Sequence, residues 1–372
     1  DGTLGIREIH GARGLVMVQD PETTQYRSMV ESAIATGLVD YVLPVREIPA
    51  KLIEYVRHRP SIDTSDTDSS TGAVDGVLNL LATDNKHDFR AYKKNTVRRR
   101  IERRMGIHHI SELSEYYDFV RRNSEELAKL AKDLIISVTS FFRDPEAFKE
   151  LLDKVIAPLV QEHDPKEPLR VWIPGCATGE EAYSIVILLL EEMARASKNT
   201  TLQVFASDIV REALKRARQG IYPGTISVDI SPERLATFFI KQNGTYQVDQ
   251  RVRDCLTFAE HNLILDPPFM RLDLVSCRNL LIYIEPAVQE KIVNLLAFAL
   301  KPSRYLFLGK ADTPADRSEF FEAVSRTWRM FRRQKSLALP IGRVPPGVLS
   351  RQVRYEEPAP RRLGELSQDV LL

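Results

Sequence analysis

Hydrophobic positions divide most of the chain into two parts with different periods. Between residues 77 and 157 apolar side chains recur every three or four positions, which predicts amphipathic helices. From residue 169 onward, short apolar runs of strand length alternate with helical stretches. The expected strands are 169–173, 202–206, 272–276 and 305–308, and the expected helices are 180–195, 210–219 and 285–300. Such alternation is typical of a parallel sheet with helices on both faces.

An insertion interrupts this alternation at residues 220–262, between the second and third strands. It contains Asn243-Gly244 flanked by β-prone residues, a strong signal for a tight hairpin. We therefore expect an α/β fold of the Rossmann-like type, with a helical N-domain and a small antiparallel β insertion at about 221–262.

Composition completes the predicted domain boundaries. A stretch rich in Ser, Thr, Asp and Gly cannot bury a core, and a proline-rich stretch without periodicity is typical of a tail. The expected parts are a mixed segment at 1–59, a linker at 60–76, the helical domain at 77–157, the α/β domain at 158–336 and a linker or tail at 337–372.

Charge and cysteine usage exclude several classes of protein. The 52 basic and 51 acidic residues give a net charge of +1, which excludes a uniformly basic coat for nucleic acid. Three cysteines at 176, 255 and 277 fit no zinc spacing or disulfide framework, so we expect no metal and a reducing, cytoplasmic setting. No apolar run is long enough to span a membrane. Since the chain starts at Asp1 without a methionine, we also expect a piece of a longer polypeptide.

A glycine turn after the first strand predicts a cofactor site. Gly175 lies between the strand at 169–173 and the helix at 180–195, where the backbone can approach a ligand at the carboxyl edge of the sheet. Asp208 follows the second strand and can accept hydrogen bonds from ribose hydroxyls. Glu180 and Glu181 at the helix N-terminus would repel a pyrophosphate, which favours S-adenosylmethionine over NAD. A structural alternative is that the two glutamates only complement the helix dipole.

Five motifs in order resemble the chemotaxis receptor methyltransferases, the CheR family. They are SVTSFFR at 137–143, GCATGEEAYS at 175–184, ASDI at 206–209, HNL at 261–263 and SCRNLLIY at 276–283. The resemblance covers about residues 77–335. It implies methyl esterification of glutamate side chains on chemoreceptors, with S-adenosylmethionine as donor and S-adenosylhomocysteine as product.

The resemblance also implies roles for individual residues. Arg143 and Tyr283 would serve the methyl-transfer site, Asp208 would hold the ribose, and Asn262 with Leu263 would flank the adenine. Ser137 departs from the asparagine that the family often has. Residues expected at the cofactor are Ser137, Thr139, Arg143, Gly175, Glu181, Asp208, Asn262, Leu263, Arg278 and Asn279.

Residues 1–58 resemble the C-terminal end of the chemotaxis receptor methylesterases, CheB. Asp1 would match the aspartate of the hydrolase triad, whose serine and histidine would lie upstream of residue 1. We therefore expect no methylesterase activity from this chain, and a parent protein that fuses an esterase and a methyltransferase.

A basic stretch at 86–104 carries nine Lys or Arg and two acidic residues. It can be a solvated helix face, or it can dock an acidic partner. Because only two aromatic residues are interleaved, nucleic acid is the less favoured partner. We expect Arg98, Arg99 and Arg103 to dock acidic helices of chemoreceptor cytoplasmic domains.

Two other functions remain open on the sequence alone. Asp266-Pro267-Pro268-Phe269 resembles a motif of amino-methyltransferases that act on nucleic acid or glutamine, although it precedes its strand instead of following it. A non-catalytic module that binds S-adenosylmethionine is the other alternative.

Overall fold

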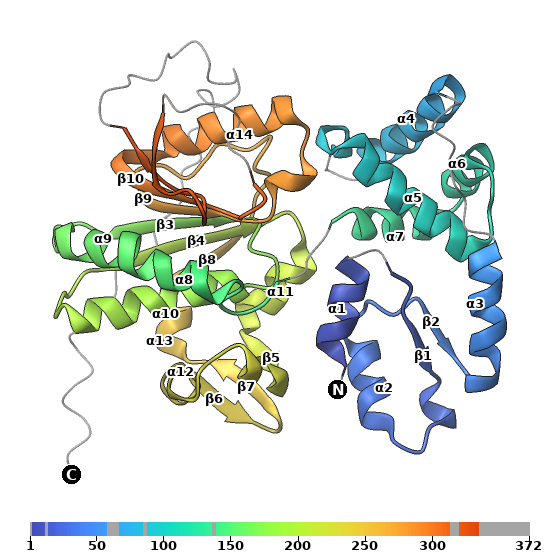
Figure 1. The fold of residues 1–372 in the computed structure, drawn as a ribbon, viewed down its shortest axis with the longest axis horizontal. Coiled ribbons are helices and arrows are strands. Elements are labelled where there is room, and N and C mark those ends of the chain that lie inside the picture. Colours follow the sequence, from blue (N-terminus) through green and yellow to red (C-terminus); the bar gives the residue numbers. More distant parts are fainter. Residues whose placement is uncertain are drawn as a thin grey trace. The chain divides into compact units, whose positions relative to one another are not determined.

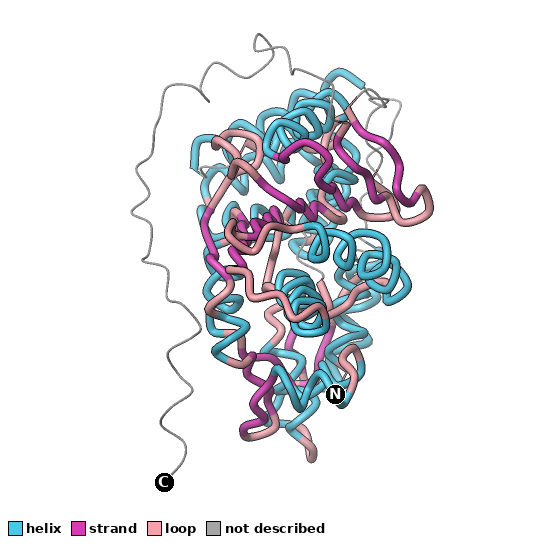
Figure 2. Tube along the Cα trace, turned by 90° about the vertical axis from the view of Figure 1, so that its left-hand side faces the viewer, coloured by secondary structure: helices cyan, strands magenta, loops and turns pink. Residues whose placement is uncertain are grey.

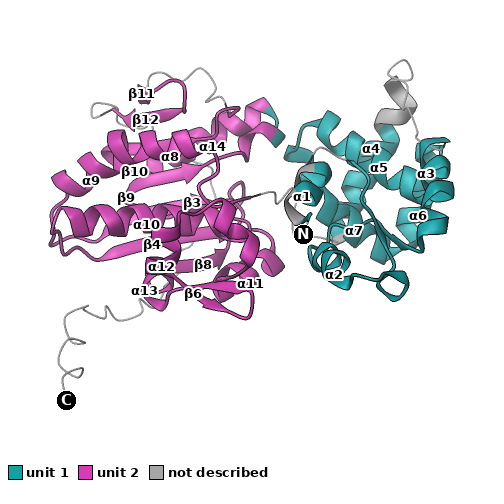
Figure 3. Cartoon of the chain, turned by 60° about the horizontal axis from the view of Figure 1, so that its bottom comes forward, with its two compact units in different colours: residues 1–138, 283–285 teal, residues 139–282, 286–372 magenta. Residues whose placement is uncertain are grey.

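The computed structural model describes residues 2–11, 14–57, 67–84, 88–135, 139–312 and 320–334. The chain forms two compact units (Figures 1 and 3). The first comprises residues 1–138 together with 283–285, and the second comprises the rest. The predicted tail at 337–372 lies outside the described residues.

A seven-stranded sheet forms the centre of the second unit. Figure 2 draws the strands of the chain in magenta and its helices in cyan. Its order is β11-β12-β10-β9-β3-β4-β8, and β8, β4, β3, β9 and β10 run parallel. From β3 the chain moves outward to β4 and β8, then returns to the other side of β3 for β9 and β10. Ligands of open α/β sheets bind at such a switch point, outside the carboxyl ends of the strands. The strands are β3 (Leu169–Pro174), β4 (Leu202–Asp208), β8 (Leu256–Glu260), β9 (Leu272–Cys277), β10 (Leu300–Leu308), β11 (Phe321–Ser325) and β12 (Met330–Arg333).

The helices of this unit confirm the alternating pattern. α10 (Glu180–Arg195) has the predicted bounds, while α11 (Arg211–Gln219) and α14 (Pro286–Ala299) start one residue later than expected. One face of β3 packs into the same apolar core as α10. On the opposite face, Trp172 and Phe205 contact the ring of Phe269.

The helices α8 (Pro145–Leu151) and α9 (Ala157–Glu162) correct the predicted domain boundary. Residues from 139 onward belong to the second unit, so the helical domain ends near residue 138 and not at 157. Phe148, Leu151 and Leu159 are buried in the core that contains β3. Helical periodicity identifies an apolar face but does not say which domain covers it, and here that domain is the sheet.

The insertion is smaller than predicted. Its sheet contains β5 (Ile221–Pro223), β7 (Thr245–Val248) and β6 (Phe239–Gln242), with the Asn243-Gly244 turn joining the last two as expected. The short helices α12 (Pro232–Phe238) and α13 (Gln250–Arg253) flank it. The final part of the predicted insertion is β8, which pairs with β4 in the main sheet. Five residues of mixed polarity carry too little pattern to distinguish these two positions.

The first unit contains a helical core and a small α/β segment. Buried apolar residues join α4 (Thr67–Asp84), α5 (Lys94–His108), α6 (Leu113–Arg122) and α7 (Ser124–Leu134). Since α4 begins at Thr67, residues 67–76 are helical and the linker prediction is wrong there. The apolar residues Val77, Leu78 and Leu81 anchor this helix. Residues 60–66 of the predicted linker lie outside the described ranges.

The α/β segment contains two short parallel strands and three helices. β1 (Met17–Gln19) pairs with β2 (Tyr41–Leu43), and the helices are α1 (Thr3–Gly11), α2 (Arg27–Ala35) and α3 (Ile48–Arg57). Within the described residues, no helix is long and apolar enough to cross a bilayer.

A buried carboxylate in the helical core gives a prediction about acid stability. Glu126 accepts hydrogen bonds from Arg104 and from Tyr116 Oη at 2.9 Å, and its Oε2 lies 2.7 Å from His108 Nε2. Burial opposes its ionisation, but the contacts with His108 and Arg104 outweigh burial and lower the pKa to about 2.

We therefore expect Glu126 to stabilise the native state above its unfolded pKa by about 3 kcal/mol. This contribution should disappear as the pH falls from about 4.5 toward 2. Urea unfolding of wild type and Glu126→Gln between pH 7 and pH 2 measures it, and the difference in stability between the two should shrink as the pH falls toward 2. A stability difference that does not change with pH would contradict the assignment.

Candidate functional site

The loop after β3 brings backbone to the carboxyl edge of the sheet. Gly175 has a φ of +71°, and a Cβ there would lie 3.2 Å from Leu280 Cδ2. Gly179 precedes α10 with a φ of +97°, where a Cβ would lie 3.0 Å from that of Ala217. Because L side chains rarely adopt such φ values, glycine is required at both places. The predicted turn at Gly175 is thus present.

Asp208 ties this loop to the end of β4. Its Oδ2 accepts a hydrogen bond from Ala177 N at 2.9 Å, and its Oδ1 accepts one from Val210 N at 2.9 Å. Only 8% of the residue is exposed. The aspartate therefore fixes the shape of the glycine loop, a role in addition to the expected contact with a ribose.

A third loop ends β8 at the same edge. Asn262 Oδ1 accepts a hydrogen bond from Ile264 N at 3.0 Å, and Asn262 N donates to Asp266 Oδ2 at 2.7 Å. Leu263 is buried. Since β3, β4 and β8 are parallel neighbours, the loops that follow them meet at one edge.

Arg278 is enclosed by protein at the end of β9. Its Nη1 lies 3.2 Å from Glu181 Oε2, and its Nη2 donates to Asp144 Oδ2 at 2.7 Å and to the carbonyl of Arg143 at 3.0 Å. The guanidinium also lies 4.7 Å from the ring centroid of Phe307. Only 1% of its side chain is exposed. Arg278 thus joins α10 to the turn at residues 143–144, and its expected contact with the cofactor stays a prediction.

Glu181 shares this cluster. Ser276 Oγ donates to its Oε1 at 2.7 Å, so both oxygens have protein partners. The side chain is 15% exposed. Only a small part of the Glu181 side chain is therefore accessible to a ligand.

The turn that carries Arg143 has a strained backbone. Phe142 and Asp144 both have positive φ values, of 47° and 63°, which are uncommon for residues with side chains. Phe142 N donates to Ser184 Oγ at 3.0 Å, and the guanidinium of Arg234 lies 4.5 Å from the Phe142 ring. Such strain persists only where the surroundings hold it, and it clusters at functional sites.

Asp312 is a site residue that sequence analysis missed. Its Oδ2 accepts hydrogen bonds from Asn279 N at 2.6 Å and Gly309 N at 3.0 Å, and its Oδ1 accepts one from Ile282 N at 2.9 Å. Burial raises its pKa, and these three N–H groups oppose that rise. Asn279, with a φ of 57°, is held in its unusual conformation by this carboxylate. Nothing in the local pattern around residue 312 indicates such a contact across 33 positions.

The remaining predicted site residues are divided between the two units and the residues that the structure does not describe. Thr139 and Arg143 are half-buried in the second unit, while Ser137 and Asp1 lie outside the described residues. Tyr283 belongs to the first unit, where its carbonyl accepts a hydrogen bond from Lys93 N at 2.9 Å and the next residue, Ile284, bridges to Tyr92.

The docking prediction for α5 needs a correction. Arg103 is buried and forms ion pairs with Asp40 and Asp133, so it cannot face a partner in this structure. Arg98 is half-buried and pairs with Glu102 at 3.1 Å, whereas Arg99 is exposed. The reason is that a segment from the N-terminal part of the chain covers this side of the helix.

The structure also places two buried cysteines and the loop at residues 266–269. Burial raises the pKa of the Cys176 and Cys277 thiols well above their usual range, which disfavours the thiolate form at neutral pH. Residues 266–269 form a loop before β9, as the sequence predicted, and Phe269 packs on the sheet. This motif therefore does not end a strand at the site.

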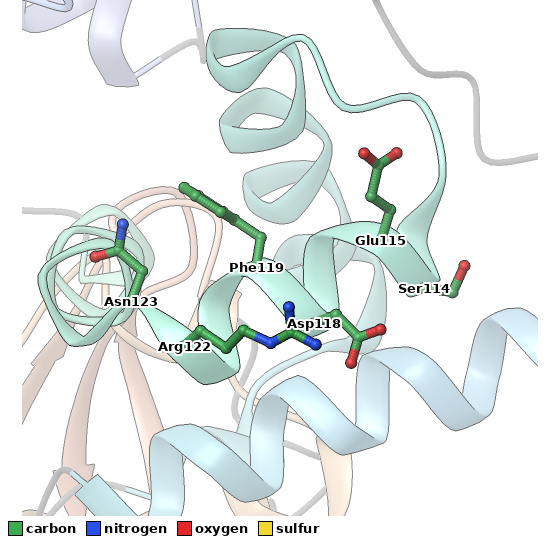
Figure 4. Close-up of a pocket in the computed structure, with 6 residues that line it drawn as sticks. All are labelled: Ser114, Glu115, Asp118, Phe119, Arg122 and Asn123. Carbon is green, nitrogen blue, oxygen red and sulfur yellow. The ribbon is translucent and has the colours of Figure 1, made fainter.

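A surface hollow on the first unit has no link to these residues. It is lined mainly by α6, and Figure 4 shows Phe119 and Arg122 among its side chains. None of its lining residues was predicted as a site residue.

Comparison with known proteins decides the family. Residues 137–330 match the family described as CheR methyltransferase, SAM binding domain, and 74–135 match its all-alpha domain. The chain belongs to the CheR family. Residues 1–52 match the family described as CheB methylesterase, so segments of both families follow one another in this chain.

Named relatives agree with this assignment. The chain is 32% identical to a putative methyltransferase Cher3 of Pseudomonas putida over 66% of its length and 91% of that protein. It is 30% identical to a chemotaxis protein methyltransferase of Salmonella typhimurium over 59% of its length and 76% of that protein. The chain is 36% identical to an uncharacterized 104.1 kDa protein of Rhodobacter capsulatus over 92% of its length. The matched region spans only 38% of that larger relative.

The chain thus carries the S-adenosylmethionine-binding domain of CheR proteins, and its residues fit that cofactor. Glu180 and Glu181 occupy the first turn of α10, which disfavours a pyrophosphate and tolerates a sulfonium cation. Gly175 leaves the backbone open to a ligand, and Asp208 offers a carboxylate at the end of β4.

Proposed function

We propose that this chain transfers a methyl group to glutamate side chains of chemoreceptor-like signalling proteins, giving methyl esters. The observation that carries the proposal is the junction formed by Arg278. This one side chain links the cofactor-side helix α10, through Glu181, to the strained turn that presents Arg143. The guanidinium of Arg143, which this turn carries, would suit a carboxylate substrate.

The proposed chemistry requires positioning more than acid–base catalysis. A glutamate side chain has a reference pKa of about 4.3, so it is already ionised at neutral pH and needs no general base. S-adenosylmethionine supplies the electrophilic methyl group. Arg143 would hold one carboxylate oxygen and leave the other to attack, and alignment then provides most of the acceleration. The buried contacts of Arg278 keep the Arg143 turn in one conformation.

Transfer of labelled methyl to purified receptor cytoplasmic domains tests the proposal. A carboxyl ester loses its label in mild base, whereas an N-methyl group keeps it. We expect base-labile label on glutamates. Base-stable label would favour the amino-methyltransferase alternative, and cofactor binding without transfer to any receptor domain would favour a non-catalytic module.

Asp208→Ala should weaken S-adenosylmethionine binding at least about 30-fold, because it removes an acceptor for the ribose and also releases the glycine loop at Ala177 N. Isothermal calorimetry measures the effect. Asp254→Ala, an exposed aspartate of the same unit, is the control and should bind as wild type does. Equal affinities of the two variants would refute the role of Asp208.

Two other parts of the function stay predictions. The exposed side of α5 around Arg99 would attract acidic receptor helices, and this attraction should weaken with salt. The chain should also release no methanol from methylated receptor, since the sequence offers only one match to the esterase triad, at Asp1.

A further inference from the structure

The N-terminal segment that matches the esterase family is joined to α5 by buried charges. We call residues 2–11 and 14–57 the esterase-like segment, of which the part up to residue 52 lies within the family match. Arg103 of α5 forms ion pairs with Asp40 of this segment and, at 2.7 Å, with Asp133 of α7. The side chains of Arg103 and Asp40 are 3% and 7% exposed. Asp40 Oδ2 also accepts a hydrogen bond from Val16 N at 2.9 Å, which holds the carboxylate in place.

A second set of contacts lies at the C-terminal end of α5. Tyr41 Oη donates to the carbonyl of Ile107 at 2.8 Å. Lys51 Nζ lies 2.7 Å from His109 Nε2, just beyond the helix. The ring of Tyr55 packs against Gly106, where an added Cβ would lie 3.1 Å from its Cε2. The side chains of α3 and β2 therefore reach the helix that carries the basic run.

The third contact involves α1. Arg100 is fully buried, and its Nη1 lies 3.4 Å from the carbonyl of His10. His10 Nε2 lies 4.0 Å from Asp133, and burial lowers the pKa of His10 to about 4. In Figure 1 the helices α1 and α7 lie side by side within the first unit, in agreement with this contact. Two arginines of α5, at positions 100 and 103, are thus covered by the esterase-like segment.

We propose that the esterase-like segment is a built-in cover for one side of α5, which occupies arginines that an acidic helix would otherwise bind. The inference extends the proposed docking of acidic receptor helices on α5. The inference rests on the complementary charges of the esterase-like segment and α5. Asp40 already pairs with Arg103, as a carboxylate of a glutamate-rich partner would do. Arg99 is exposed and lies on the side of α5 that the segment does not cover.

Opening the cover should increase the affinity of α5 for an acidic helix. Asp40→Lys places a cation against Arg103 and should separate the two surfaces. Glu31→Lys is the matched control, because it makes the same change in net charge on the exposed face of α2. The probe is a fluorescein-labelled helical peptide of alanine and glutamate, titrated at low salt and followed by fluorescence anisotropy.

We expect Asp40→Lys to bind this peptide about fivefold more tightly than Glu31→Lys, with the difference lost at high salt. Hydrogen exchange at residues 100–107 should be faster in Asp40→Lys alone. If Asp40→Lys does not fold, Asp40→Asn takes its place, with a gain of about twofold over Glu31→Gln.

Equal affinities of the matched variants, or a peptide that binds none of them, would overturn the proposal. Neither measurement needs S-adenosylmethionine. If methyl transfer to receptors fails while Asp40→Lys still gains affinity, the proposed substrate is wrong and the cover stands. If transfer succeeds while the affinities are equal, the cover is wrong and the proposed function stands.

Discussion

Replacing Arg278 by lysine should reduce kcat/KM for methyl transfer at least about 100-fold, equivalent to about 2.7 kcal/mol of transition-state stabilisation. Lysine keeps the charge but lacks the planar fork that reaches Glu181, Asp144 and the Arg143 carbonyl at once. Partners left unpaired in a buried cluster are costly, so we also expect a loss of about 3 kcal/mol in unfolding free energy.

The reduction in kcat/KM should come mainly from the methyl-transfer step and not from cofactor binding. Because the guanidinium is enclosed by its protein partners, we expect affinity for S-adenosylmethionine to change much less than kcat. Arg218→Lys is the control, since this exposed arginine donates to the carbonyl of Phe258 away from the cluster. If Arg278→Lys retains wild-type kcat, or if its defect lies entirely in cofactor affinity, Arg278 does not position the Arg143 turn.

Replacing Asp312 by alanine should destabilise the chain by about 4 kcal/mol, because one buried and two part-buried N–H groups lose their acceptor at about 1–3 kcal/mol each, less what water recovers. The affected loop starts directly after Arg278 and continues to Ile282. Activity of the folded fraction should therefore fall as well. Chemical unfolding and methyl-transfer assays at a temperature where the variant is folded measure the two effects.

Two companion variants sharpen this test. Asp312→Asn keeps one acceptor oxygen and should fall between wild type and Asp312→Ala. Gly309→Ala leaves the carboxylate intact, but its Cβ would lie 2.7 Å from Asn279 N and 2.6 Å from Asp312 Oδ2, so it should disturb the same loop. An Asp312→Ala variant as stable as the surface control Asp254→Ala would show that the loop needs no carboxylate.

The basic helix shows why charge in a sequence does not determine exposure. Nine cations in a run of nineteen residues predict a cationic surface, and Arg99 fits that prediction. Arg103 does not, because its carboxylate partners lie 63 positions earlier and 30 positions later in the chain. No periodicity within the helix carries information about either partner.

The sequence by itself determined the alternation of strands and helices, the glycine turn at 175 and the position of Asp208 after its strand. These features depend on local periodicity, backbone conformation and the rule that parallel strands present their carboxyl ends at one edge. Only the tertiary structure decided that β8 joins the main sheet, that α8 and α9 belong to it, and that Arg278 and Asp312 hold the site from within. Such assignments depend on which distant surface covers a given face, and a short stretch of sequence fits several surfaces equally well.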